Sequence, residues 1–118
     1  MNTTNGNNTD TPKELWIGLV EVRPLKGSEY LQGSKEAFVN IVTWASDGAE
    51  FRRKADLIFG KMRLFVVEIE NPEPIDTRAR RLEVEEFDEV IEDMLARARG
   101  NRNAIIYGTF HTWKRDTA

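Results

Sequence analysis

The chain has 118 residues, of which 40% are hydrophobic and 31% charged, and its formal net charge is −3. This length favours one globular domain with a hydrophobic core of its own, and the absence of cysteine excludes disulfides, thiolate metal sites and cysteine nucleophiles. The negative charge disfavours duplex DNA or RNA as a partner, and no apolar run is long enough to predict a bilayer span. We therefore expect a cytoplasmic protein with no membrane partner.

The N-terminal stretch, residues 1–12, is rich in Asn and Thr and has no apolar segment. A secretory signal requires such a segment, so we do not interpret this stretch as a signal peptide. Its composition is typical of chain that stays disordered because it has little apolar surface to bury. We predict a disordered leader over residues 1–12 and a single domain over residues 13–118.

Two segments with the alternation of β-strands follow, at residues 14–22 and 37–44. The connection between them, residues 23–35, contains Gly27 and Gly33 and is predicted to be a loop with at most one short helical turn. It is long for a connection in a compact domain, which favours a functional or mobile loop.

Residues 47–59 are predicted to form the first helix. Asp47 is a suitable N-cap residue, and Glu50 follows three residues later, as in a capping box. Gly60 is placed to end the helix in the left-handed conformation. The apolar residues of this segment share one stripe at helical spacing: Phe51, Ala55, Ile58 and Phe59.

The third strand is predicted at residues 63–70, where the Asn-Pro-Glu-Pro sequence of residues 71–74 breaks it. Residues 75–83 are interpreted as a polar connection, and the second helix is predicted over residues 84–99. Its first turns are acidic and its last turn is basic, which matches the helix macrodipole, and Gly100 ends it. One face of this helix carries an apolar stripe: Phe87, Val90, Ile91, Met94, Leu95 and Ala98.

Residues 103–113 are predicted to form the fourth strand, and neither of its faces is clearly polar. Ala104, Ile106, Gly108 and Phe110 lie on one face, and Ile105, Tyr107, Thr109, His111 and Trp113 lie on the other. A strand with one face in water alternates hydrophobic and polar residues more cleanly. The second face of the sheet therefore needs a cover, which is another layer of this chain, a second copy of it or a ligand.

The predicted element order β-β-α-β-α-β places the chain in the α+β class. We predict a two-layer α/β sandwich in which a four-stranded mixed sheet carries two helices on one face. Right-handed crossovers would make the second, third and fourth strands parallel. A ferredoxin-like fold is the alternative, and it requires a further strand at residues 78–84. The arginines of that segment argue against a central position in a sheet, although they are tolerated at an edge.

The alternation within each strand defines the two faces of the sheet. The helix-covered face is assigned Leu15, Ile17, Leu19, Val39, Ile41, Phe65, Val67, Ile69, Ile106 and Phe110. The second face is assigned Trp16, Val20, Val22, Phe38, Asn40, Val42, Trp44, Leu64, Val66, Glu68, Glu70, Ile105, Tyr107, His111 and Trp113. A face this apolar marks an interface or a groove if the chain leaves it uncovered. If the two helices instead lie on opposite faces, the same residues are ordinary core.

The candidate interface or ligand residues come from this second face: Trp16, Phe38, Asn40, Trp44, Glu68, Glu70, Tyr107, His111 and Trp113. Large aromatic side chains dominate the energetics of protein interfaces. The first hypothesis is therefore a small non-catalytic interaction or regulatory domain, which forms a homodimer or binds another protein through this aromatic sheet face.

The alternative hypothesis is a small-molecule-binding protein or enzyme with a pocket over Glu68, Glu70 and His111. Two carboxylates and an imidazole on one face can perform acid–base chemistry or ligate a divalent metal. The chain has one histidine and no glycine-rich phosphate loop, so no spacing is diagnostic of either chemistry. We assign no catalytic residue, no metal and no cofactor.

A basic patch for phosphate or an acidic partner is a further candidate, formed by Arg52, Arg53, Arg78, Arg80 and Arg81. The simpler interpretation is a solvated helix face and a solvated loop, in which neighbouring glutamates neutralise the arginines. Single-stranded nucleic acid is not expected on the aromatic face either, because that face carries few basic residues.

Overall fold

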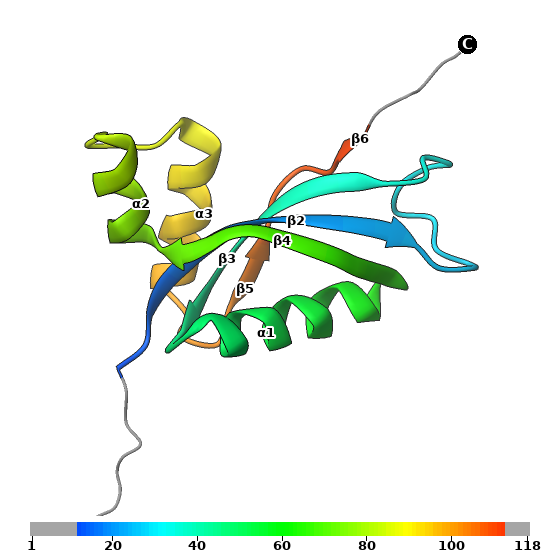
Figure 1. Cartoon of the computed structure of the whole chain (residues 1–118), viewed down its shortest axis with the longest axis horizontal. Coiled ribbons are helices and arrows are strands. Elements are labelled where there is room, and N and C mark those ends of the chain that lie inside the picture. Colours follow the sequence, from blue (N-terminus) through cyan, green and yellow to red (C-terminus); the bar gives the residue numbers. More distant parts are fainter. Residues whose placement is uncertain (1–11, 113–118) are drawn as a thin grey trace, which may run out of the picture.

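The computed structural model describes residues 12–112, so most of the expected leader and the candidate residue Trp113 lie outside it. The elements in chain order are β2 (Glu14–Pro24), β3 (Ala37–Ala45), α1 (Gly48–Lys61), β4 (Leu64–Pro74), α2 (Ile75–Leu82), α3 (Glu89–Arg99), β5 (Ile105–Tyr107) and β6 (His111–Thr112) (Figure 1). Within this described part, no helix has the length and apolarity needed to cross a membrane. The chain is a small α+β domain, as predicted.

Every hydrogen-bonded strand pair in the described sheet is antiparallel, in the order β4-β2-β3-β5, with β6 also paired to β3. The predicted mixed sheet is wrong for a topological reason. β3 and β4 are both antiparallel to β2, so they run in the same direction, but β2 lies between them. The crossover through α1 therefore skips one strand and creates no parallel pair.

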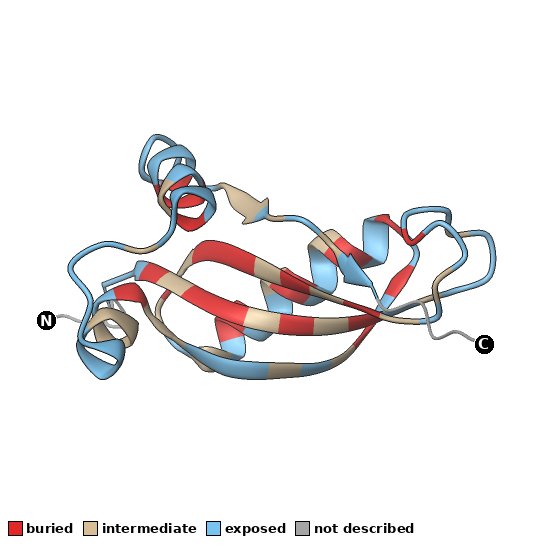
Figure 2. Ribbon diagram, turned by 90° about the horizontal axis from the view of Figure 1, so that it is seen from above, coloured by how far each residue is buried: buried red, intermediate tan, exposed pale blue. Residues whose placement is uncertain are grey.

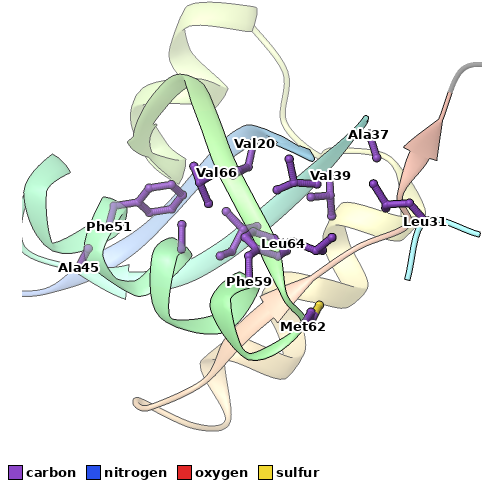
Figure 3. Close-up of a cluster of buried hydrophobic side chains, with 13 residues drawn as sticks. Val20, Leu31, Ala37, Val39, Ala45, Phe51, Phe59, Met62, Leu64 and Val66 are labelled. Carbon is purple, nitrogen blue, oxygen red and sulfur yellow. The ribbon is translucent and has the colours of Figure 1, made fainter. Parts of the chain in front are cut away.

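Helices cover both faces of the sheet, which corrects the prediction of two helices on one face. α1 packs its buried residues Phe51, Ala55 and Phe59 against one face, and Figure 3 shows Phe51 and Phe59 in this core. On the opposite face, Ile75 of α2 and the apolar stripe of α3 form a second core. The architecture is α1 on one side, the sheet in the middle and the α2–α3 pair on the other side (Figure 1).

The pairing register explains why the predicted faces were mixed. Leu15 pairs with Trp44, and Trp16 pairs with Thr43. Partners directly opposite in an antiparallel pair point to the same side, so Trp16 and Trp44 point to opposite faces. Buried positions concentrate on the two central strands (Figure 2), and each of these strands contributes side chains to both cores.

The core under α1 contains Val20, Val22, Val39 and Ile41, none of which is measurably exposed. Together with their neighbours on α1 and β4, these side chains supply much of the stability, at roughly 1.5–3 kcal/mol for each large apolar side chain removed from water. The second core is smaller, and it is closed by a hydrogen bond of 2.8 Å from Trp44 Nε1 to the carbonyl oxygen of Ala98.

The third strand is longer than predicted, because β4 continues through residues 71–74 to Pro74. Its register against β2 shifts between Leu19 and Ile17, and Asn71 there has a φ of 49°. A β-bulge of this kind absorbs an extra residue without ending the strand. Prolines are tolerated because β4 is an edge strand, whose outer backbone groups need no partner strand.

The segment that follows is helical, which corrects its interpretation as a polar connection. Residues 75–82 form α2, so the strand that a ferredoxin-like fold requires at residues 78–84 is not observed, and that alternative is not confirmed. α3 begins at Glu89, five residues after the predicted start, with Asp88 as its N-cap.

The end of α1 and the last predicted strand also differ from the prediction. Gly60 lies inside α1, and Arg63 is the residue that adopts the left-handed conformation, with a φ of 58°. The strand predicted at residues 103–113 is divided into β5 and β6, with residues 108–110 between them. The two strands predicted at residues 14–22 and 37–44 are confirmed, and each extends by one or two residues.

Candidate interaction surface

One end of the sheet lacks a helical cover on the side that carries α2 and α3. These two helices lie over the end of the sheet where β2 begins, and among residues 12–112 no helix lies over the other end on that side (Figure 1). Alternation along the strands, together with the registers, assigns the side chains that point to this uncovered area. We name it the open half-face, and it comprises Leu19, Glu21, Arg23, Phe38, Asn40, Phe65, Glu68, Glu70 and His111.

Direct cross-strand neighbours build this surface. Glu68 of β4 pairs with Glu21 of β2, Glu21 pairs with Phe38 of β3, and Phe38 pairs with His111 of β6. The adjacent row runs from Glu70 through Leu19 to Asn40. The open half-face therefore has carboxylates along β2 and β4 and an aromatic and an imidazole ring along β3 and β6.

The exposure of these residues distinguishes the open half-face from the rest of the sheet. Phe65 is 56% exposed, although it belongs to a strand that is buried by α1 on its other side. Glu68, Glu70 and His111 are exposed, and Leu19, Phe38 and Asn40 are half-buried. By contrast, Ile17 and Val42, which lie on the same side under α3, are 1% and 0% exposed.

The charge of the open half-face is acidic. Arg23 Nη2 lies 3.7 Å from a carboxylate oxygen of Glu21 and 3.8 Å from one of Glu36. Across residues 12–112, neither Glu68 nor Glu70 has a cation within ion-pair distance. Like charges directly opposite in a sheet are unfavourable, so the Glu68–Glu21 pair favours a cation from outside the domain.

Of the predicted site residues, the structure brings together Phe38, Asn40, Glu68, Glu70 and His111. Trp44 points to the same side, but α3 covers it, and Arg102 lies 4.5 Å above its ring. Trp16 and Tyr107 point to the α1 side instead, where Trp16 packs against Phe51 and Tyr107 lies near Phe59. The predicted continuous aromatic face is therefore not formed.

The predicted pocket residues do not enclose a site within the described domain. Glu68 and His111 are separated by β2 and β3, which places their backbones roughly 14 Å apart, three interstrand spacings. All three side chains of the trio are exposed. Among residues 12–112 there is also no group of three His, Asp or Glu side chains arranged to hold a metal ion.

Sequence reasoning missed Leu19, Arg23 and Phe65 as members of this surface. Leu19 and Phe65 were expected on the helix-covered face, because alternation within one strand does not define how that strand is turned relative to its neighbours. The charges of Glu21 and Arg23 were the available signal. They alternate with the apolar Val20 and Val22, which indicates that one face of β2 is in water at its C-terminal end.

Two clusters of charged residues lie elsewhere and stabilise the fold. Glu50 accepts hydrogen bonds from Lys13 Nζ at 2.6 Å and from the backbone and hydroxyl of Ser46. The Lys13 contact, with the Ser46 bonds, lowers the pKa of Glu50 to about 2. Asp47 caps α1 by accepting from the backbone N–H of Glu50, so the predicted N-cap is confirmed.

The second cluster joins α2 to the end of β4. Glu73 accepts from the guanidinium groups of Arg81 and Arg78, and these bonds lower its pKa to about 2. Arg78 also donates to the carbonyl oxygen of Asn71 at 2.8 Å. Two members of the suspected basic patch therefore share an ion pair with Glu73, a carboxylate that sequence reasoning did not pair with them.

The chain matches no protein family model, no curated protein and no solved structure with which it was compared. Its function is therefore argued from the geometry of the open half-face.

Proposed function

We propose that this chain is a small non-catalytic interaction domain that binds a protein partner through the open half-face. The observation that carries the proposal is the exposure of Phe65, an aromatic side chain of β4 beside Glu68 and Glu70, neither of which has a cation within ion-pair distance among the described residues. Exposed aromatic groups with a polar rim are characteristic of protein interfaces. This surface replaces the wider aromatic face expected from the sequence.

The charge of the surface favours a different protein over a second copy of this chain. A two-fold dimer brings the same patch of each subunit together. Here it would bring Glu68 and Glu70 of one copy close to the carboxylates of the other, and the open half-face as defined contains one basic residue, Arg23, which already lies beside Glu21 and Glu36. Such like-charge contacts cost several kcal/mol at an interface, so we expect a monomer that binds a partner with basic residues.

The open geometry also favours binding over catalysis. Glu68, Glu70 and His111 are exposed to solvent. Catalytic groups generally lie in concave sites that enclose the substrate. A small-molecule pocket over this trio is therefore the weaker candidate, and it would require a partner surface to close it.

Site-specific photo-crosslinking tests the proposal. A benzoylphenylalanine residue is placed at Phe65 and, as a matched control, at Leu57, an apolar α1 residue of similar exposure at 55%. Both variants are expressed in the native cells, the adduct is identified, and its partner is purified. We expect a discrete adduct from position 65 alone and direct binding of the purified partner to the wild-type domain.

The charge-reversed double variant Glu68→Lys with Glu70→Lys provides the second comparison. It should weaken binding of the purified partner at least about tenfold, because two favourable charge contacts become repulsive. Identical adducts from positions 65 and 57, or partner binding that the double variant leaves unchanged, would contradict the proposed role of the open half-face.

A further inference from the structure

The outer edge of β4 borders the open half-face. β4 is the first strand in the sheet order, with β2 on one side and no strand on the other among the described residues. An edge strand presents backbone N–H and C=O groups that can pair with an added strand. α1 packs against one face of β4, and the other face carries Phe65, Glu68 and Glu70. An added strand would therefore rest beside the open half-face.

The two carboxylates of β4 have the spacing of alternate positions in a neighbouring strand. Glu68, Ile69 and Glu70 pair in unbroken register with Glu21, Val20 and Leu19. This regularity places Glu68 and Glu70 on the same face, roughly 7 Å apart along the strand. Basic residues at every second position of an added strand would lie directly opposite them, with no change in β4.

The ends of β4 limit what can be added. The register with β2 shifts between Glu21 and Val22 and again between Leu19 and Ile17, so a bulge lies on each side of the Glu68–Glu70 segment. Pro72 has no backbone N–H to donate. Bulges, proline and charges are the features that prevent edge-to-edge pairing of identical strands, so a second β4 is excluded and a short basic strand is admitted.

We propose that β4 binds, along its outer edge, an extended segment of a partner protein that carries Lys or Arg at every second residue. This inference rests on the proposed interaction function and specifies the chemistry of the partner. Backbone hydrogen bonds to β4 would give affinity, and ion pairs with Glu68 and Glu70 would select the basic sequence and its register. The apolar portions of the basic side chains would cover Phe65.

A peptide titration of the full chain, followed by backbone amide NMR, tests the inference. The probe is a seven-residue peptide with capped ends in which lysine alternates with threonine or valine. A second probe has the same composition with the lysines in one block. A third has N-methyl groups on every second amide, which keeps the charge and removes the hydrogen bonds that strand addition needs.

The alternating probe should shift the amide resonances of residues 64–71 and slow their hydrogen exchange. The block and N-methylated probes should bind at least about tenfold more weakly, because they lose the register or the backbone bonds. Glu68→Lys with Glu70→Lys should reduce binding by a similar factor. The matched control, Glu85→Lys with Glu86→Lys, makes the same charge change on exposed residues between α2 and α3 and should leave binding unchanged.

Equal binding of all three probes, or shifts spread over the acidic residues between α2 and α3, would overturn strand addition. The peptide titration tests strand addition, whereas the crosslinking experiment tests the interaction function, so either claim can fail without the other. A partner captured at position 65 with no effect of the alternating probe on β4 would remove the strand-addition mechanism and leave the interaction function intact.

Discussion

Gly18 allows the ring of Phe51 to lie directly on the sheet. A Cβ atom at this position would come within 2.9 Å of Phe51 Cε2 and 3.1 Å of Ile69 Cγ2. Both neighbours belong to the packed core under α1, so neither can move away without disturbing other contacts. The absence of a side chain at Gly18 therefore sets the distance between α1 and the strands beneath it.

Alanine substitutions at two glycines should have opposite effects on stability. Gly18→Ala should lower the free energy of unfolding by about 1–3 kcal/mol, because it overpacks the core. Gly60→Ala, at an exposed site inside α1 with no atom within 4 Å of the added Cβ, should raise it by up to about 1 kcal/mol. Urea denaturation of both variants measures the two changes, and a Gly18→Ala protein as stable as the wild type would contradict the packing described.

Glu50 should make stability depend on acidic pH. Its pKa is about 2 in the folded protein and near 4.5 when unfolded, so the unfolded state binds a proton first as the pH falls. The stabilisation is therefore present above pH 4.5 and is lost between pH 4.5 and 2. Glu50→Gln should destabilise the protein most at pH 7, and the difference from wild type should shrink below pH 4.5, measured by urea denaturation across this range. A difference that does not change with pH would contradict this role.

At the scale of elements, α2 depends on ion pairs more than on apolar burial. Ile75 is its one buried residue, and Glu73 holds it through Arg78 and Arg81. The segment has eight residues, and its apolar residues Ile75, Ala79 and Leu82 do recur at helical spacing, but its four charged residues led to its interpretation as a polar connection. The helix is held by the carboxylate of Glu73, which lies in β4 just before α2. Glu73 is in this position because β4 continues past Asn71.

Arg78→Leu should loosen this connection. The substitution removes the bonds to Glu73 and Asn71 and leaves a largely buried carboxylate with one cation, at a cost of about 1–3 kcal/mol. Hydrogen exchange should accelerate in α2 before it does in β3. Arg80→Leu, at an exposed position of the same helix, is the matched control and should change stability by less than about 0.5 kcal/mol. Equal effects of the two substitutions would show that the cluster does not hold α2.

The strands and helices differ in how far sequence could predict them. Alternation identified the first two strands almost to the residue, and the cap at Asp47 identified the start of α1. The register between strands could not be predicted in the same way, because alternation is equally satisfied when one strand is turned over relative to its neighbour. That ambiguity placed Trp16 and Trp44 on the same face.

At the scale of the whole molecule, the covering of the sheet determines where a partner can bind. Because two helices were predicted, one whole face of the sheet was expected to lack a helical cover. In the structure both faces carry helices, but one face is covered only in part. α1 lies on one face, and the α2–α3 pair covers only part of the other. Phe38, Asn40, Glu68, Glu70 and His111 were predicted from residue type and alternation. The absence of Trp16, Trp44 and Tyr107 from the open half-face depends on strand register and long-range packing that no local pattern reveals.

Cysteine accessibility tests this arrangement most directly, because the chain has no cysteine of its own and each introduced thiol reports on one position. Phe65→Cys and Glu68→Cys probe the open half-face, Val42→Cys probes the area under α3, and Val39→Cys probes the area under α1. Far-ultraviolet circular dichroism first confirms that each variant is folded.

In the folded protein, thiols at positions 65 and 68 should react with N-ethylmaleimide at nearly the rate of the unfolded chain. Thiols at positions 39 and 42 should react at least about 100-fold more slowly, since they require local opening of a packed core. Rapid labelling at position 42 in a folded variant would contradict the α3 cover. Protection at positions 65 and 68 in the purified domain would contradict the open half-face on which the proposed function depends.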